Sequence, residues 1–241
     1  GQLNQFKESS ARGISTLIFP EGTTWGYGGL KKIHSSVYHI LENTFQGTGR
    51  KVFILPVNIK VDRLVKGAKD VFIRIGQPVF FRKPKDEFNR TLFEILQQLH
   101  TITFSQVAAY YLKRLAEMKQ DAGRTVVFHK GLFVRNLEGI LLEMSRLVRE
   151  RALPGFDPGL ANRRYLADKT EHFTKYCLKM QYLQKKRWSD RKEALLLNVE
   201  KILANYSVRE FRKANPLGFC ANELASLGEQ TVRPIFDARL R

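Results

Sequence analysis

Short apolar runs bounded by glycine and proline fill the first third of the chain, and they predict strands joined by loops. Residues 16–19, 52–61 and 71–81 form three such runs, the second interrupted by Pro56. Between the first two runs, apolar residues recur at helical spacing from Leu30 to Phe45. The order strand, helix, strand fits a βαβ unit, so this part of the chain is predicted to form an α/β layer.

The remaining two thirds of the chain has the spacing of helices. Apolar residues recur at helical intervals over residues 88–118 and 133–153, and again after Asp190, a residue type that caps helices. The pattern changes near Pro84, because proline disfavours helix in the residue before it. The predicted domains are therefore an α/β domain over residues 1–85 and a mainly α-helical domain over residues 86–241.

The chain is strongly basic. Its 241 residues include 41 Lys and Arg against 23 Asp and Glu, a net charge of +18. Residues 1–85 hold 14 basic and 5 acidic residues, which is half of this excess. Such a charge favours an anionic partner, namely nucleic acid, phospholipid headgroups or a phosphorylated substrate. A hydrophobic content of 43% supplies a core and excludes general disorder, and no apolar stretch approaches the roughly 18 residues of a membrane span.

A loop after the first apolar run gathers groups that could bind an anion. A carboxylate follows Pro20, a glycine lets a ligand approach the backbone, and two threonines add hydroxyl groups. The next helix is predicted to begin near residues 28–30, so that two lysines in its first turn would form a phosphate site with the free N–H groups. The candidate binding residues are Glu21, Gly22, Thr23, Thr24, Lys31 and Lys32. From spacing alone, a turn with a solvated carboxylate explains the same residues.

The hexapeptide over residues 18–23, Ile-Phe-Pro-Glu-Gly-Thr, resembles the FPEGT block of the glycerolipid acyltransferase family, which includes lysophosphatidate and glycerol-3-phosphate acyltransferases. Residues 53–59 are similar to the family's later apolar-Pro-Val block, and residues 71–79 to the strand and Gly-x-Pro turn that follow. Residues 3–13 resemble the helix and glycine turn before the block. The resemblance spans residues 3–81 and implies the C-terminal half of an acyltransferase α/β domain, followed by the mainly α-helical region.

The resemblance implies transfer of a fatty acyl group from acyl-CoA or acyl carrier protein to a lysophospholipid or glycerol-phosphate acceptor in phospholipid biosynthesis. Glu21, Gly22 and Thr23 would line the acceptor site. The protein would lie in the cytoplasm, peripherally on an anionic membrane surface, and would need neither cofactor nor metal.

Two departures from the family pattern limit the implied activity. Thr24 stands where relatives usually carry an arginine that would help to hold the acceptor phosphate, so Lys31 or Lys32 would have to compensate. The family's catalytic His-x-x-x-x-Asp element is absent, since none of the five histidines is followed by Asp or Glu at the fifth position. We therefore expect no catalytic residue in this chain and an N-terminally truncated enzyme; a non-catalytic homologue is the alternative.

Other candidate groups have ordinary explanations. His34 and His39 are five residues apart, do not share a helix face and have no third ligand nearby, so surface histidines are predicted. Cys177 and Cys220 cannot form a disulfide framework and are predicted to be buried, neutral thiols.

Two basic clusters beside aromatic residues, at residues 163–165 and 185–188, are compatible with contact to anionic lipid headgroups, and a solvated helix face explains them equally well. RNA binding is a further alternative. A non-catalytic basic module that binds an anionic membrane or nucleic acid is thus the second functional hypothesis. Nucleic acid is the weaker of its two partners, because the sequence shows no RNP-like, zinc or helix-turn-helix pattern. No motif indicates a role for residues 86–241.

Overall fold

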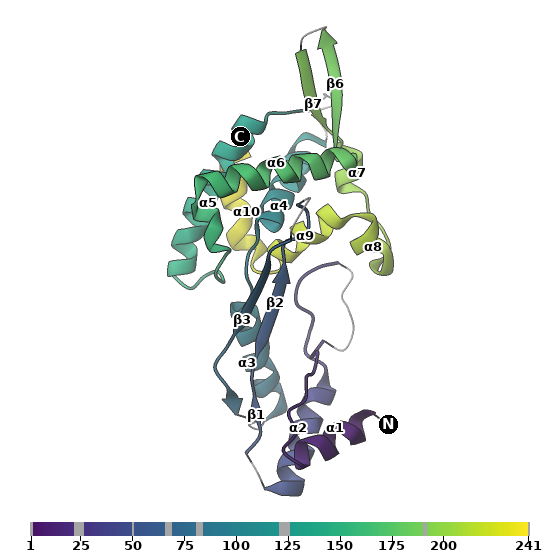
Figure 1. Ribbon diagram of the computed structural model, residues 1–241, viewed down its shortest axis with the longest axis vertical. Coiled ribbons are helices and arrows are strands. Elements are labelled where there is room, and N and C mark those ends of the chain that lie inside the picture. The colour runs from purple at the N-terminus through teal and green to yellow at the C-terminus, as the bar shows by residue number, and fades with distance from the viewer. Residues whose placement is uncertain are drawn as a thin grey trace. The chain divides into compact units, whose positions relative to one another are not determined.

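The computed structural model describes residues 2–21, 27–49, 51–65, 69–80, 84–120, 126–189 and 192–240. These residues combine helices with small antiparallel sheets, as the mixed α and β pattern predicts (Figure 1). The chain divides into two compact units. The first contains residues 1–25, 30–58 and 73–100, and the second contains residues 26–29, 59–72 and 101–241. The predicted domain boundary at residue 85 lies within the first unit.

Helices α1 (Gln2–Ala11), α2 (Ser35–Thr48) and α3 (Lys85–Gln98) belong to the first unit. Both α1 and α3 pack against α2. The core of this unit consists of apolar side chains that recur at helical spacing on α2 and α3. They are Val37, Tyr38, Leu41, Phe88, Leu92 and Leu96, together with Ile33 just before α2. The helix expected within residues 3–13 is confirmed as α1. The helix expected from Leu30 onward is confirmed as α2, although α2 begins later than expected.

The strands between α2 and α3 are short. Strand β1 (Phe53–Ile54) pairs with β4 (Val79–Phe80) in antiparallel fashion, and β2 (Val57–Val61) pairs with β3 (Val71–Ile75). The predicted interruption at Pro56 separates β1 from β2. The third predicted strand is divided into β3 and β4, because the intervening segment contains a proline that has no N–H for a ladder.

The predicted βαβ unit is wrong, because its first strand is not formed. Residues 16–19 belong to no helix or strand, no described strand pairs with them, and Leu17 and Phe19 are each 76% exposed. The later strands find antiparallel neighbours instead. The local apolar run predicted a strand, but it could not supply the partner that a strand needs.

The apolar runs of the first unit are covered on one face only. Ile18 and Ile54 pack against the helical core, whereas their neighbours Leu17, Phe19 and Phe53 are exposed. Runs that are apolar on both faces are typical of strands from sheets with helices on both sides. The described part of this unit therefore presents a bare apolar face.

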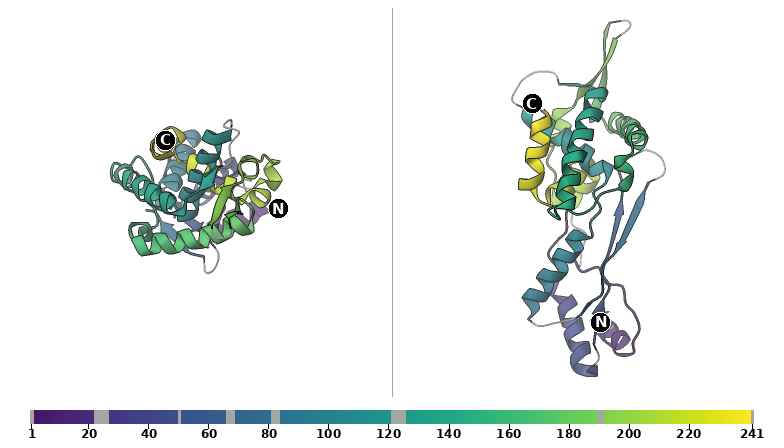
Figure 2. Two further views of the ribbon diagram at one scale, coloured as in Figure 1. Left: turned by 90° about the horizontal axis from the view of Figure 1, so that it is seen from above. Right: turned by 90° about the vertical axis from the view of Figure 1, so that its left-hand side faces the viewer.

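The second unit is built around helix α4 (Phe104–Lys119), whose first nine residues are buried on every side. Helices α6 (Arg163–Lys179), α9 (Pro216–Ala225) and α10 (Glu229–Leu240) contact α4 directly. Helix α5 (Lys130–Arg149) lies beside α10, as Figure 2 shows. The short helices α7 (Val199–Leu203) and α8 (Val208–Ala214) pack on α9, and the 3-10 turn η2 (Pro158–Ala161) on α6. Across the described part of the chain, no helix is both long and apolar enough to cross a membrane.

A three-stranded antiparallel sheet completes the second unit, with the order β5 (Val127–Phe128), β7 (Lys192–Leu197), β6 (Leu183–Ser189). Strands β6 and β7 extend away from the helices of this unit as a hairpin (Figure 1). The helix predicted from Asp190 onward is wrong. Strand β7 forms because it pairs on both sides, and only residues 199–203 become helical. Tertiary pairing thus outweighs the helical spacing that links Leu195 to Val199 and Ile202.

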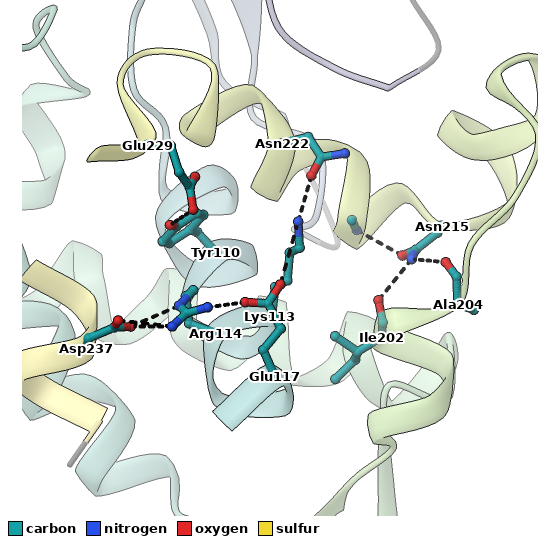
Figure 3. A network of polar contacts seen from close by, with 11 residues as sticks. Tyr110, Lys113, Arg114, Glu117, Ile202, Ala204, Asn215, Asn222, Glu229 and Asp237 are labelled. Atoms are coloured by element: carbon teal, nitrogen blue, oxygen red, sulfur yellow. Dashed lines mark hydrogen bonds and ion pairs between the residues drawn. The ribbon is translucent and has the colours of Figure 1, made fainter. Parts of the chain in front are cut away.

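Polar contacts fasten α4 to the C-terminal helices (Figure 3). The Arg114 guanidinium donates to both carboxylate oxygens of Asp237 on α10, at 2.9 and 3.0 Å, and also contacts Glu117. One turn earlier, the Tyr110 hydroxyl donates to Glu229 at 2.8 Å. These contacts fix the rotation of α4 within the unit.

Candidate functional site

Glu21 lies in the predicted binding loop, directly before residues 22–26, which the structure does not describe. The segment that leads to α2 forms hydrogen bonds with Glu21 and with Pro20 before it. Its Oε2 accepts a hydrogen bond of 2.8 Å from the backbone N–H of Lys31. The carbonyl of Pro20 accepts one of 2.7 Å from the N–H of His34. The carboxylate is therefore fixed against the chain, which differs from a simple solvated turn.

The electrostatic environment of Glu21 is that of a half-buried carboxyl group. Burial raises its pKa above the ordinary glutamate value, and the N–H and the charge of Lys31 act in the opposite direction. An ionised carboxylate accepts hydrogen bonds from hydroxyl groups and repels phosphate. Glu21 therefore suits the hydroxyl of an acceptor alcohol, whereas an acceptor phosphate would need the nearby lysines.

The predicted helix start beside Lys31 and Lys32 is wrong. Gly28 and Gly29 have φ angles of 92° and 88°, which a right-handed helix excludes. The N–H groups of residues 31 and 34 bond to Glu21 and Pro20, and α2 begins only at Ser35. The two lysines thus precede the helix, and its first turn offers them no anion site.

The capping of α2 uses a histidine side chain. His34 is the N-cap, and its Nδ1 accepts a hydrogen bond of 3.2 Å from the N–H of Ser36. This contact satisfies one of the free N–H groups that the phosphate-site hypothesis required.

The structure brings together two of the six predicted site residues. Glu21 contacts the backbone of Lys31, and Lys32 is exposed on the same segment. Residues 22–24, which are Gly22, Thr23 and Thr24, lie outside the described residues.

The histidines and cysteines take the positions that the sequence predicts. His34 and His39 are exposed, and His39 Nδ1 lies 3.8 Å from Glu42 Oε2 on the surface of α2. Cys177 and Cys220 are buried free thiols, and burial raises the pKa of each. In the residues described, no group of three or more His, Cys, Asp or Glu is placed to hold a metal ion.

The second basic cluster lies on a hairpin. Lys185 and Lys186 are exposed on β6, so the solvated helix face considered for this segment is wrong, while the side chains of residues 187–188 lie outside the described ones. The first cluster is divided: Arg163 is exposed and bonds to Glu138 at 3.0 Å, whereas Tyr165 turns toward a group of carboxylates.

That group, the carboxylate cluster, is the feature that sequence reasoning missed. It consists of Asp62, Asp70, Asp157, Tyr165 and Lys169, all in the second unit. Lys169 Nζ donates to Asp62 at 2.8 Å and also to Asp70, and Ser105 N–H donates to Asp62 at 3.0 Å. No local pattern announces this cluster, because its members are up to 107 positions apart.

The acyltransferase resemblance thus depends on the residues of the chain itself, chiefly the hexapeptide that ends in the Glu21 loop. No family model, no curated protein and no solved structure matches the chain.

Proposed function

We propose that this chain is the acceptor-binding part of a glycerolipid acyltransferase, the C-terminal half of an α/β domain followed by a helical region. The observation that carries the proposal is Glu21 of the FPEGT block, a half-buried carboxylate held by Lys31. A carboxylate fixed in this way is suited to orient the hydroxyl of an alcohol.

The acceptor is proposed to be a lysophospholipid or a glycerol phosphate. Its free hydroxyl would bond to Glu21, next to Gly22 and Thr23. Its phosphate would be held by Lys31 and Lys32 with the hydroxyl of Thr24, because the family's arginine is missing at that position. The hydrogen bond from Lys31 to Glu21 supports a place for Lys31 at this site, and both lysines would act as side-chain cations that precede α2.

The architecture of the first unit supports an α/β acyltransferase domain. Its apolar runs pack helices on one face and leave Leu17, Phe19 and Phe53 exposed on the other. In the complete domain we expect further elements to cover this second face.

The remaining parts of the proposal concern partners and place. The acyl donor would be acyl-CoA or acyl carrier protein, and the net charge of +18 would attract both anionic substrates and an anionic leaflet. We propose peripheral attachment to the cytoplasmic face of a membrane. Since the sequence has no His-x-x-x-x-Asp element, we expect binding of the acceptor but no turnover by this chain.

Removing the two lysines is expected to weaken acceptor binding selectively. For the Lys31→Ala/Lys32→Ala variant, calorimetric titration with glycerol 3-phosphate should give a dissociation constant about tenfold higher than that of the unchanged chain, since two phosphate contacts are lost. Lys185→Ala/Lys186→Ala is the matched control, because it removes the same charge from exposed positions of the second unit. Equal weakening by both variants would indicate unspecific attraction and contradict the proposed site.

The second candidate is a non-catalytic basic module, favoured by the exposed Lys185 and Lys186 on the hairpin. Flotation with phosphatidylglycerol vesicles and titration with single-stranded RNA separate its two partners. Salt-sensitive RNA binding without vesicle binding would favour this candidate over the acyltransferase.

A further inference from the structure

The carboxylate cluster contains one hydroxyl group between two carboxyl groups. The Tyr165 oxygen lies 2.8 Å from Asp70 Oδ2 and 2.6 Å from Asp157 Oδ2, and both distances are those of O–H···O hydrogen bonds. A tyrosine hydroxyl has a single hydrogen to donate. One of the two contacts therefore needs a hydrogen from the other partner, since two bare acceptor oxygens at this distance repel each other.

The neighbours of the two carboxyl groups decide which one carries the additional hydrogen. Asp70 Oδ2 also receives a bond from the Lys169 ammonium, which favours its ionised form. Among the described residues, no cation bonds to Asp157, whose Oδ1 accepts the N–H of Gly159 at 2.8 Å. Asp157 is also only 3% exposed. A buried carboxyl group without a bonded cation is the one that keeps a proton.

The charges of the cluster point to the same assignment. Among the residues that the structure describes, three carboxyl groups gather around one ammonium group, so full ionisation would leave an excess of negative charge in a largely buried place. One retained proton halves this excess. Asp62 is fully buried and already accepts from Lys169 and from the N–H of Ser105, so it is well compensated as an anion.

We propose that Asp157 keeps its proton in the folded protein at a pH where an ordinary aspartate has lost it, and that it donates this hydrogen to Tyr165, which donates its own to Asp70. This chain of hydrogen bonds joins the segment that bears Asp62 and Asp70 to helix α6 and to η2, and it forms a pH-sensitive clasp within the second unit. The proposal is independent of the acyltransferase assignment.

The direction of the pH dependence follows from the environments of the two carboxyl groups. Burial raises the pKa of Asp157, and the charge of Asp62 adds to this effect. The hydrogen bonds with Tyr165 and with the N–H of Gly159, together with the charge of Lys169, act in the opposite direction. The bond from Lys169 lowers the pKa of Asp70 against its partial burial. Asp157 therefore stabilises the fold below the ordinary aspartate pKa, and this contribution is lost as the pH rises through its raised value. Asp70 contributes above the ordinary pKa and loses its contribution in acid.

Carbon-13 NMR of the side-chain carboxyl groups tests the proposal on the intact chain. The Asp157 resonance is expected to titrate with a midpoint above the ordinary aspartate value of about 3.9, and Asp70 with a midpoint below it. A midpoint for Asp157 at or below that value overturns the proposal. This readout needs only the unchanged protein, so it holds even if variants of the cluster do not fold.

The Asp157→Asn variant tests the clasp with a side chain that does not titrate. Its amide nitrogen can donate to Tyr165 and its oxygen can accept from Gly159, so it resembles the protonated carboxyl group. Between about pH 3 and pH 9, the melting temperature of the unchanged chain should fall relative to this variant as the pH rises through the raised pKa of Asp157. Asp168→Asn, at an exposed position of the same helix, is the control and should follow the unchanged chain. Parallel curves for all three proteins would refute the clasp.

Discussion

Replacing Phe173 by alanine is expected to lower the free energy of unfolding of the second unit by about 3–5 kcal/mol. Phe173 on α6 is fully buried. Its ring meets Phe104 of α4 edge to face, with centroids 5.8 Å apart, and stacks on Phe133 of α5 at 6.0 Å. Alanine would leave a cavity where three helices join, and the loss is measured by urea denaturation followed through the helical circular dichroism signal.

A matched change on the surface shows that the effect comes from burial. Leu142 on α5 is 70% exposed, and Leu142→Ala should change the free energy of unfolding by no more than about 0.5 kcal/mol. A loss below about 1 kcal/mol for Phe173→Ala would mean that the three helices do not meet at this ring.

The second large effect is expected at the contact between α4 and α10. Asp237→Ala removes both acceptors of a guanidinium that is only 7% exposed, and should cost about 3 kcal/mol of unfolding free energy. The value lies at the lower end for buried pairs because the Asp237 side chain is 24% exposed and Arg114 keeps its contact with Glu117. Chemical denaturation of the variant at neutral pH gives the measurement.

Two further variants separate an uncompensated charge from lost packing. Arg114→Met combined with Asp237→Leu should recover most of the stability, since removing both partners leaves no buried charge alone. Arg146→Ala breaks an exposed pair with Glu143 and Glu150 on α5 and should leave stability unchanged. If Asp237→Ala leaves the free energy of unfolding as unchanged as Arg146→Ala does, the contact between Arg114 and Asp237 does not hold α4 to α10.

Helices were the part of the fold that local sequence predicted best. The helical spacing of apolar residues over 133–153 corresponds to α5. The spacing over residues 88–118 corresponds to α3 and α4, which are separated by residues 99–103. Each needs only its own spacing and one apolar face to be recognised. Helix α4 differs from the other two because it has no single apolar face. Its residues 104–112 are buried on every side, so its central position depends on the helices that surround it.

Strands were predicted less well because a strand needs a partner that the local sequence does not contain. The run over residues 16–19 has the composition of a buried strand but remains an unpaired, exposed segment. Conversely, Leu195 is expected on a helix face with Val199 and Ile202, but it lies in β7, a strand between β5 and β6. In both cases the pairing of distant residues decided the outcome.

The two polar sites differ in the same way. Glu21 and Lys31 are ten positions apart, so the loop and its neighbours could be identified from one stretch of sequence. The hydrogen bonds that replaced the expected helix start there depend on backbone geometry, which spacing does not encode. Asp62 and Lys169 are 107 positions apart and have no local signal, so only the fold shows them as a pair.

The central claim is that residues around Glu21 bind the acceptor of an acyltransferase. The most direct measurement is photo-crosslinking with a lysophosphatidate that carries a photoreactive group near its free hydroxyl, followed by mass spectrometric mapping of the labelled peptides. The account predicts labels within residues 18–34, competition by unlabelled lysophosphatidate, and loss of these labels in the Lys31→Ala/Lys32→Ala variant but not in Lys185→Ala/Lys186→Ala. Labels confined to residues 86–241, or spread over the chain without competition, would contradict it.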